Sequence, residues 1–202
     1  MNLGAKDMGL MTPKENKREL IMESAIQVFS QKGYHNTKME EIAVAAGIGK
    51  GTIYEYFPGK LQLLQEILER SFYLYDHSIK VDINNSLSVK QKIRRLVEGH
   101  FRFCQENKDL TRILFFDTEI IDSELRDWAW QKRKRKEEHM QALFAEAISN
   151  GEIRDLDTKM LTTMISGIFT SFWVPVVIDG WDIDAATAAE QVTDIIMHGI
   201  KK

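Results

Sequence analysis

The stretch that most constrains the fold is residues 33–60, GYHNTKMEEIAVAAGIGKGTIYEYFPGK. Thr37 and Glu40 have the spacing of a capping box, in which each side chain bonds the main-chain N–H of the other residue, so they predict the start of a helix. Gly47 predicts the end of that short helix, because a tight turn needs a residue that tolerates positive φ. A second short helix, about 49–57, follows and ends before a Pro-Gly pair. Two short helices joined by a glycine turn form a helix-turn-helix, which presents one helix to the major groove of DNA.

The second of these helices, the recognition helix, has one predicted inward side. Ile53 and Phe57 are four residues apart and therefore face the core of the head. The opposite side and the flanks offer hydroxyl, carboxylate, phenol and ammonium groups that can bond base edges or phosphates. We predict DNA contacts from these groups and from residues near the neighbouring helix ends: Thr37, Lys38, Lys50, Gly51, Thr52, Tyr54, Glu55, Tyr56 and Lys60.

The same stretch resembles the DNA-binding segment of the TetR family of one-component transcriptional regulators. The likeness covers about residues 18–64 without a gap, with one departure, since Gly49 stands where the family more often has Ser or Thr. It implies a small DNA-binding head, an effector pocket between the helices of a larger body, and a dimer interface formed by the last two helices of each subunit. The matching residues are Ala25, Phe29, Gly33, Tyr34, Thr37, Ile42, Ala43, Ala46, Gly47, Lys50, Gly51, Thr52, Tyr54, Tyr56, Phe57, Lys60 and Leu61.

Charge does not by itself point to DNA. The chain of 202 residues has a formal net charge of −3 at pH 7. Residues 1–60 contain eight Lys and Arg against seven Asp and Glu, a net charge of +1, so a local set of cations must supply any attraction to phosphate. The alternative therefore stays open that the chain is a helical ligand-binding or interaction protein without operator binding.

Helical spacing of apolar residues continues beyond the head, and we predict an all-α fold with a three-helix head and a larger helical body. We expect a flexible N-terminal arm over 1–12, a helix-turn-helix DNA-binding domain over 13–60, and an effector-binding and dimerisation domain over 61–202. Besides the two short helices, the predicted helices span about 14–32, 60–80, 89–107, 109–121, 123–149, 157–178 and 185–200.

Several features indicate a cytoplasmic protein. The single cysteine, Cys104, excludes an intrachain disulfide and fits a reducing compartment. Residues 1–12 lack the apolar core of a secretory signal. Residues 160–178 are uncharged and long enough to span a membrane, but they contain five Ser and Thr, and aspartates flank them on both sides. We therefore expect no membrane partner and a helix buried on two sides of a soluble assembly.

Aromatic and sulfur-containing side chains are dense in the body. Core packing explains each of them singly, but together they can line a cavity for an apolar molecule, and the resemblance implies an effector pocket there. Drug-like amphiphiles and acyl-chain metabolites fit such a pocket equally well. The predicted ligand-binding residues are Phe101, Cys104, Phe115, Trp128, Phe144 and Met164.

No catalytic or metal chemistry is indicated. His100 and Cys104 lie four residues apart, as two metal ligands can, but spacing indicates no third ligand, so we predict no metal. We find no set of nucleophile and base and no phosphate-binding glycine loop, and we predict neither an enzyme nor a cofactor. The five cations at 132–136 lie within a helix and precede two glutamates, which is typical of a solvated face.

The helix at about 157–178, which is uncharged over 160–178, predicts a second subunit. A helix in a soluble protein usually keeps a charged face toward water, whereas this one has Thr, Ser and Gly there. With the resemblance, the last two helices predict a homodimer whose interface contains Ile165, Phe169, Phe172, Trp173, Val192 and Ile196. The resulting expectation is a repressor that binds a palindromic operator in double-stranded DNA as a homodimer and is released by a small apolar or amphiphilic effector.

Overall fold

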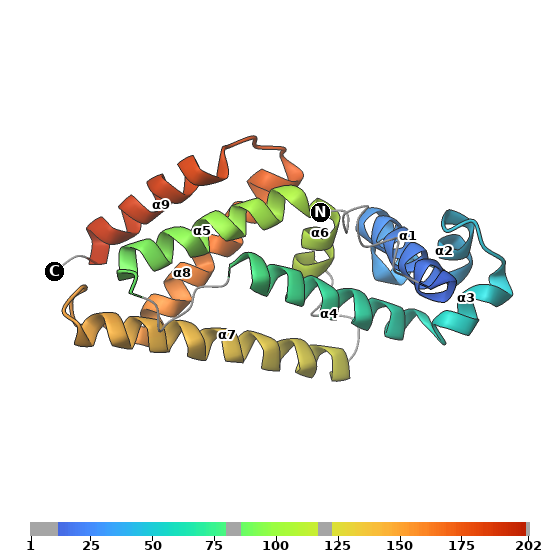
Figure 1. Cartoon of the computed structure of the whole chain (residues 1–202), viewed down its shortest axis with the longest axis horizontal. Coiled ribbons are helices and arrows are strands. Elements are labelled where there is room, and N and C mark those ends of the chain that lie inside the picture. The colour runs from blue at the N-terminus through green and yellow to red at the C-terminus, as the bar shows by residue number, and fades with distance from the viewer. Residues whose placement is uncertain (1–11, 80–85, 117–122, 201–202) are drawn as a thin grey trace. The chain divides into compact units, whose positions relative to one another are not determined.

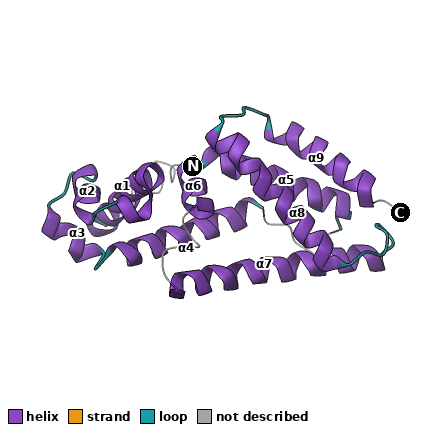
Figure 2. Cartoon of the chain, turned by 180° about the vertical axis from the view of Figure 1, so that it is seen from behind, coloured by secondary structure: helices purple, strands orange, loops and turns teal. Residues whose placement is uncertain are grey.

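The computed structural model describes residues 12–79, 86–116 and 123–200. These residues form α-helices, one π-helical turn and connecting loops, with no strand among them (Figure 2). The all-α fold predicted from helical periodicity is therefore confirmed. Of the predicted N-terminal arm, 1–12, only Thr12 lies within the described residues.

The described residues divide into two compact units. The first contains residues up to 73 together with 106–126, and the second contains 74–105 together with 127 onward. The boundary that the sequence suggested for the DNA-binding domain, residue 60, falls inside the first unit.

The first unit is built from four helices and most of a fifth (Figure 1): α1 (Pro13–Asn36), α2 (Met39–Ala45), α3 (Lys50–Tyr56), α4 (Lys60–Ser78) as far as residue 73, and α6 (Lys108–Phe116). A capping box opens α1, because the Glu15 N–H donates to the Thr12 hydroxyl and the Thr12 N–H donates to the Glu15 carboxylate at 2.7 Å. Near its end, Gly33 has a φ of 75° and breaks the helical geometry, one residue after the predicted end of this helix. The buried core includes Ile21, Ala25, Phe29, Ile42, Ile53, Phe57, Leu64, Ile67 and Ile113.

The predicted capping box of α2 is wrong by one residue. Lys38 is the N-cap, and its N–H donates to the Glu41 carboxylate at 2.9 Å. The Thr37 hydroxyl instead donates backward to the Gly33 carbonyl at 2.8 Å and is buried. Thr37 therefore caps the end of α1 and not the start of α2, and the Glu40 carboxylate pairs with Lys50.

The second unit contains the remaining helices: α5 (Val89–Glu106), most of α7 (Ser123–Ser149), α8 (Thr158–Trp173) and α9 (Ala185–Ile200). After Trp173 the chain winds into a π-helical turn, Val174–Ile178, in which the Asp179 N–H donates to the Val174 carbonyl at 3.1 Å. Pro175 has no N–H to give to an α-helical bond, which accounts for the change of winding at this point.

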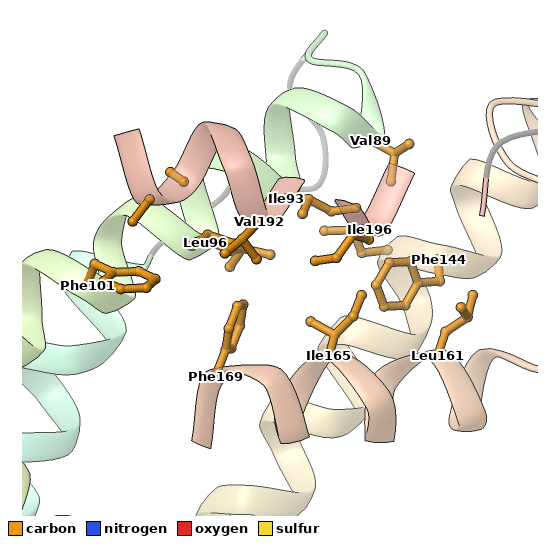
Figure 3. Packing of buried hydrophobic residues seen from close by; sticks show 14 of the residues in the cluster. Val89, Ile93, Leu96, Phe101, Phe144, Leu161, Ile165, Phe169, Val192 and Ile196 are labelled. Atoms are coloured by element: carbon orange, nitrogen blue, oxygen red, sulfur yellow. The ribbon is translucent and has the colours of Figure 1, made fainter. Parts of the chain in front are cut away.

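One apolar core holds these helices together. Phe101 of α5, Phe144 of α7, Phe169 of α8 and Val192 of α9 point toward one another (Figure 3). All four side chains are buried. Side chains from four helices thus close a single core, as the apolar spacing of each helix requires.

Four of the six residues predicted for the dimer interface are buried in the core of their own subunit. Ile165 and Phe169 of α8 and Val192 and Ile196 of α9 lie in this core (Figure 3), and Phe172 and Trp173 pack against it half-buried. The outward row of α8 instead carries Met160 and Met164, which are 65% and 61% exposed. Because α8 has apolar residues in several rows and its one charged residue, Lys159, lies in the first turn, only its neighbours decide which row turns inward.

The stretch Thr158–Ile178 is long and apolar enough to cross a membrane by length and composition. Of the most apolar 18 residues in this stretch, 33% are buried inside the protein. Its inward row fills the core of the second unit, so packing accounts for the apolar residues of that row.

A histidine stands inside this apolar core with a partner for each ring nitrogen. The hydroxyl of Tyr75 lies 3.0 Å from Nδ1 of His100, and Sγ of Cys104 lies 3.7 Å from Nε2. The Phe169 ring stacks on the imidazole with a centroid separation of 5.1 Å. Burial is the main cause that lowers the pKa of His100 to about 4, so the ring is neutral at pH 7.

The last turn of α4 is held against two other helices of the second unit. Lys136 of α7 pairs with Asp76 at 2.8 Å, and its ammonium lies 4.2 Å from the centroid of the Tyr75 ring. On α5, Gly99 permits a close approach, because a Cβ there would lie 2.0 Å from the Ser78 carbonyl oxygen. Any larger residue at this position would displace the end of α4.

The neutral His100 predicts a specific dependence of stability on pH. The unfolded chain protonates this ring below about pH 6.5, whereas the folded chain does so only near pH 4. The contribution of the neutral His100 ring to the free energy of unfolding is therefore fully present above pH 6.5 and is lost as the pH falls toward 4. Between pH 7 and pH 5 the free energy of unfolding should drop about 2 kcal/mol more in the wild type than in His100→Asn.

Urea unfolding at the two pH values measures this difference. His139→Asn, at an exposed position of α7, is the control and should behave like the wild type. An equal drop in the wild type and in His100→Asn would contradict the buried neutral histidine.

Candidate nucleic-acid interface

The recognition helix, α3, presents a polar side to solvent. Ile53 and Phe57 are fully buried, as the sequence predicts. Lys50, Gly51, Tyr54 and Glu55 are exposed, and Thr52 and Tyr56 are half-buried. The inward and outward sides of this helix therefore agree with the i, i+4 analysis.

The turn between α2 and α3 depends on glycine. Gly47 has a φ of 64°, and the N–H of Ile48 donates back to the Ala43 carbonyl at 3.0 Å, which closes the end of α2. Gly49 is the N-cap of α3 and supplies no side-chain cap. The turn thus fixes the angle between the two helices through main-chain bonds.

Lys50 forms an ion pair with a residue of α2. Its ammonium lies 2.8 Å from the Glu40 carboxylate on an exposed surface. The hydrogen bond to Lys50 is the main cause that lowers the pKa of the Glu40 carboxyl, and the same bond raises the pKa of Lys50. A phosphate that bound Lys50 would compete with this carboxylate, and an exposed pair of this kind is weak enough to yield.

Lys60 and Thr37, both predicted to contact DNA, hold the head together instead. The Lys60 ammonium donates to the carbonyls of Tyr34 at 2.6 Å and Thr37 at 2.7 Å, and a longer bond reaches His35 at 3.4 Å. The same ammonium lies 4.2 Å from the centroid of the Tyr34 ring. Desolvation lowers the pKa of Lys60. This cation therefore caps the C-terminal end of α1 from the first residue of α4.

Arg18 of α1 reaches two other helices of the first unit. One guanidinium nitrogen donates to the Tyr56 carbonyl at 2.9 Å, and another pairs with Glu66 of α4. The guanidinium carbon lies 4.3 Å from the centroid of the Phe57 ring. The sequence indicates only that Arg18 is one of several cations near the head, because its partners are 38 or more residues away.

The residues predicted to bind an effector do not form one lining. Phe101, Cys104 and Phe144 are buried in the second unit, and Trp128 is half-buried with the Lys132 ammonium 5.7 Å from its ring centroid. Met164 is exposed and is not a core residue, which corrects its predicted place among the pocket residues. The side chain of Phe115 lies outside the described residues.

A groove of about 670 Å³ lies between α5 and α9. The side chains that line it are all of polar or charged types. The lining residues are Lys90, Arg94, Thr187, Glu190, Gln191, Thr193 and Asp194. Within the described ranges, no three His, Cys, Asp or Glu side chains gather as metal ligands would.

Comparison with known proteins supplies the family. Residues 21–67 match the family described as bacterial regulatory proteins, tetR family, and residues 86–200 match the tetracycline repressor-like C-terminal domain. The Fatty acid metabolism regulator protein of Bacillus subtilis (strain 168) is 25% identical over 191 residues, which cover 94% of this chain and 98% of that protein.

Solved structures agree with this match. The fatty acid degradation regulator FadR from Bacillus halodurans superposes with a TM-score of 0.78 at 25% identity, covering 94% of this chain and 97% of the other. FadR from Bacillus subtilis, solved in complex with stearoyl-CoA, has a TM-score of 0.75 at 24% identity and shares the fold, with coverage of 90% and 98%. Since the two family matches together span most of the sequence, including both the helix-turn-helix and the helical body, the chain belongs to the TetR family of bacterial transcription regulators.

Proposed function

We propose that this TetR-family regulator is a ligand-responsive repressor that acts in the cytoplasm as a homodimer on a palindromic operator. The observation that carries the proposal is the geometry of α3, whose buried anchors Ile53 and Phe57 leave a polar side exposed. A helix held in this way is what reading of the major groove requires. In this proposal residues 13–60 read DNA, residues 61–202 bind the effector and dimerise, and the arm 1–12 precedes them.

The exposed side of α3 divides into two kinds of contact. Lys50 and the phenols of Tyr54 and Tyr56 lie where they can meet phosphates, which fixes the position of the head on the duplex. Thr52 and Glu55 can reach base edges, and a carboxylate accepts from the amino group of cytosine. The pair of Lys50 with Glu40 lowers the net attraction of the head for DNA of any sequence.

The dimer surface proposed here is the outward side of α8 and α9. It contains Met160 and Met164, together with Ile195, which is 72% exposed. Thr163 and Gly167 lie on the exposed side of α8, and such small residues allow a second helix to approach closely. An exposed apolar surface of this kind marks a site of association. A two-fold dimer places two α3 helices symmetrically, and a palindromic operator follows from that symmetry.

The proposed effector is a fatty acyl thioester. The names of the Bacillus relatives connect them with fatty acid metabolism or degradation. The core of the second unit offers aromatic and aliphatic side chains from four helices, which is the chemistry that an acyl chain would meet. A drug-like cationic amphiphile is the competing class, because the same side chains would accept it.

The two lysines at α3 and α4 should behave differently on substitution. Lys50→Ala should weaken binding to operator and scrambled DNA alike and flatten the slope of log affinity against log salt by about one unit. Lys60→Met should leave that slope unchanged and lower the free energy of unfolding by about 1–3 kcal/mol, because the Tyr34 and Thr37 carbonyls lose a charged donor. Lys134→Ala, an equal loss of charge at an exposed position of α7, is the control. A flatter slope in Lys60→Met would mean that this ammonium leaves its carbonyls for a phosphate.

The dimer surface can be tested with one charge. Met164→Glu should convert the dimer to a monomer at micromolar concentration and reduce operator binding, because an unpaired carboxylate in a dry interface is costly. Trp130→Glu, at an exposed large side chain of α7, is the matched control and should stay dimeric. Sedimentation velocity measures both. A Met164→Glu dimer as stable as the wild type would place the interface elsewhere.

Operator binding and its release test the whole proposal. DNA selected from a random pool by the wild-type protein should be palindromic. Stearoyl-CoA should raise the melting temperature and lower operator affinity by about 5- to 150-fold, the usual range of coupling between sites. Coenzyme A alone and stearate alone are tested in the same two measurements, to separate the contribution of the coenzyme A group from that of the acyl chain. If a cationic amphiphile released the operator and stearoyl-CoA did not, the assignment of an acyl effector would be wrong. If the DNA selected from the random pool shared no sequence, the proposal of operator binding would be wrong.

A further inference from the structure

The C-terminal end of the recognition helix α3 is tied to α1 and α4 by one side chain. Arg18 donates to the Tyr56 carbonyl at 2.9 Å, has its guanidinium carbon 4.3 Å from the centroid of the Phe57 ring, and pairs with Glu66. The three contacts use separate parts of one planar group. A lysine could not make all three, because its ammonium is a single point.

The Tyr56 carbonyl is the last one in α3. Carbonyls in the last turn of a helix have no partner within the helix and must find one elsewhere. A cation at this end also interacts favourably with the helix dipole. Arg18 therefore supplies the C-terminal cap that the sequence of α3 lacks.

A cap matters more for α3 than for a long helix. With seven residues, Lys50–Tyr56, α3 has few internal hydrogen bonds, and a helix this short is not stable by itself. Its direction is set by the groups that hold it. Ile53 and Phe57 hold its inward side by burial, and Arg18 holds the main chain at its C-terminal end through the Tyr56 carbonyl.

A second ion pair joins the same two long helices without touching α3. Arg70 of α4 pairs with Glu19 of α1, and both side chains are 21% exposed. The Arg18 and Glu66 side chains are 39% and 25% exposed. The two pairs thus have the same chemistry and join the same elements, and they differ in that only Arg18 contacts α3.

We propose that Arg18 is a positioning residue for DNA reading, which acts by holding the C-terminal end of α3 against α4 through Glu66. It does not contact DNA in this assignment. Loss of the tie leaves the head folded but lets α3 tilt, so that contacts with base edges suffer and contacts with phosphates, which tolerate small displacements, persist. This inference rests on the proposed function as far as operator reading is concerned, and on the head alone as far as the order of α3 is concerned.

The test compares two double variants. Arg18→Met with Glu66→Gln removes the tie, and Arg70→Met with Glu19→Gln removes the other pair. Each changes the net charge by zero and leaves no unpaired carboxylate. Affinity is measured for a selected operator and a scrambled DNA at several salt concentrations, below the melting temperature of both variants.

The first double variant should bind the operator about tenfold more weakly, because binding must then supply the free energy that orders the end of α3. Its affinity for scrambled DNA should stay within about twofold of the wild-type value. The slope of its log affinity against log salt should equal the wild-type slope within experimental error. The second double variant should match the wild type on both DNAs. Reduced specificity with unchanged phosphate binding separates a positioning role from loss of stability.

Amide hydrogen exchange in the DNA-free protein gives a readout that needs no operator. The amides of residues 53–57 should exchange about tenfold faster in the first double variant and at the wild-type rate in the second. If the wild type binds no DNA selectively, the proposed function fails while exchange still decides the role of Arg18.

Three results would overturn the inference. Equal losses of operator affinity in both double variants would show that the contacts of Arg18 contribute to the stability of the head and not to the position of α3. Parallel losses on operator and scrambled DNA with a flatter salt slope would make Arg18 a phosphate contact. Unchanged exchange in the first double variant would show that α3 is held without it.

Discussion

The burial of Ile53 and Phe57 is the interaction on which DNA reading by this protein depends. A helix of seven residues cannot hold its own conformation in water, and burial of two large apolar side chains contributes roughly 1.5–3 kcal/mol each toward holding it. Both residues are fully buried in the first unit. The Gly47 turn fixes the N-terminal end of α3, and Arg18 caps the other end. With α3 held in this way, the side chains on its polar side can vary to match a DNA sequence without destabilising the fold.

The cations of the head serve structure as much as binding. Lys60 holds main-chain carbonyls, Arg70 pairs with Glu19, and Lys50 pairs with Glu40. This explains how a head with almost no net charge can belong to a DNA-binding family. Since general attraction to DNA grows with the number of cations that neutralise phosphates, a head with several of its cations already paired gains relatively more from correct contacts with bases.

The second unit combines an apolar core with one buried polar group. Its helix α8 has apolar residues on the inward side, where Ile165 and Phe169 close the core, and on the outward side, where Met160 and Met164 are exposed. His100 remains in this core because Tyr75 and Cys104 approach its ring nitrogens, and a fully partnered polar group specifies one arrangement of its neighbours.

The sequence by itself determined what depends on neighbours along the chain: the helices, the turn at Gly47, the inward side of α3 and the family. It did not determine which row of α8 faces the core, because several rows are apolar and the one charge, Lys159, lies in the first turn. It also did not separate Lys50 from Lys60, since both are lysines at the start of a helix. Only the tertiary structure decided these points. Lys60 meets carbonyls 23 and 26 residues away, Arg18 meets a carbonyl 38 residues away, and contacts over such separations depend on how whole helices pack, which no local pattern encodes.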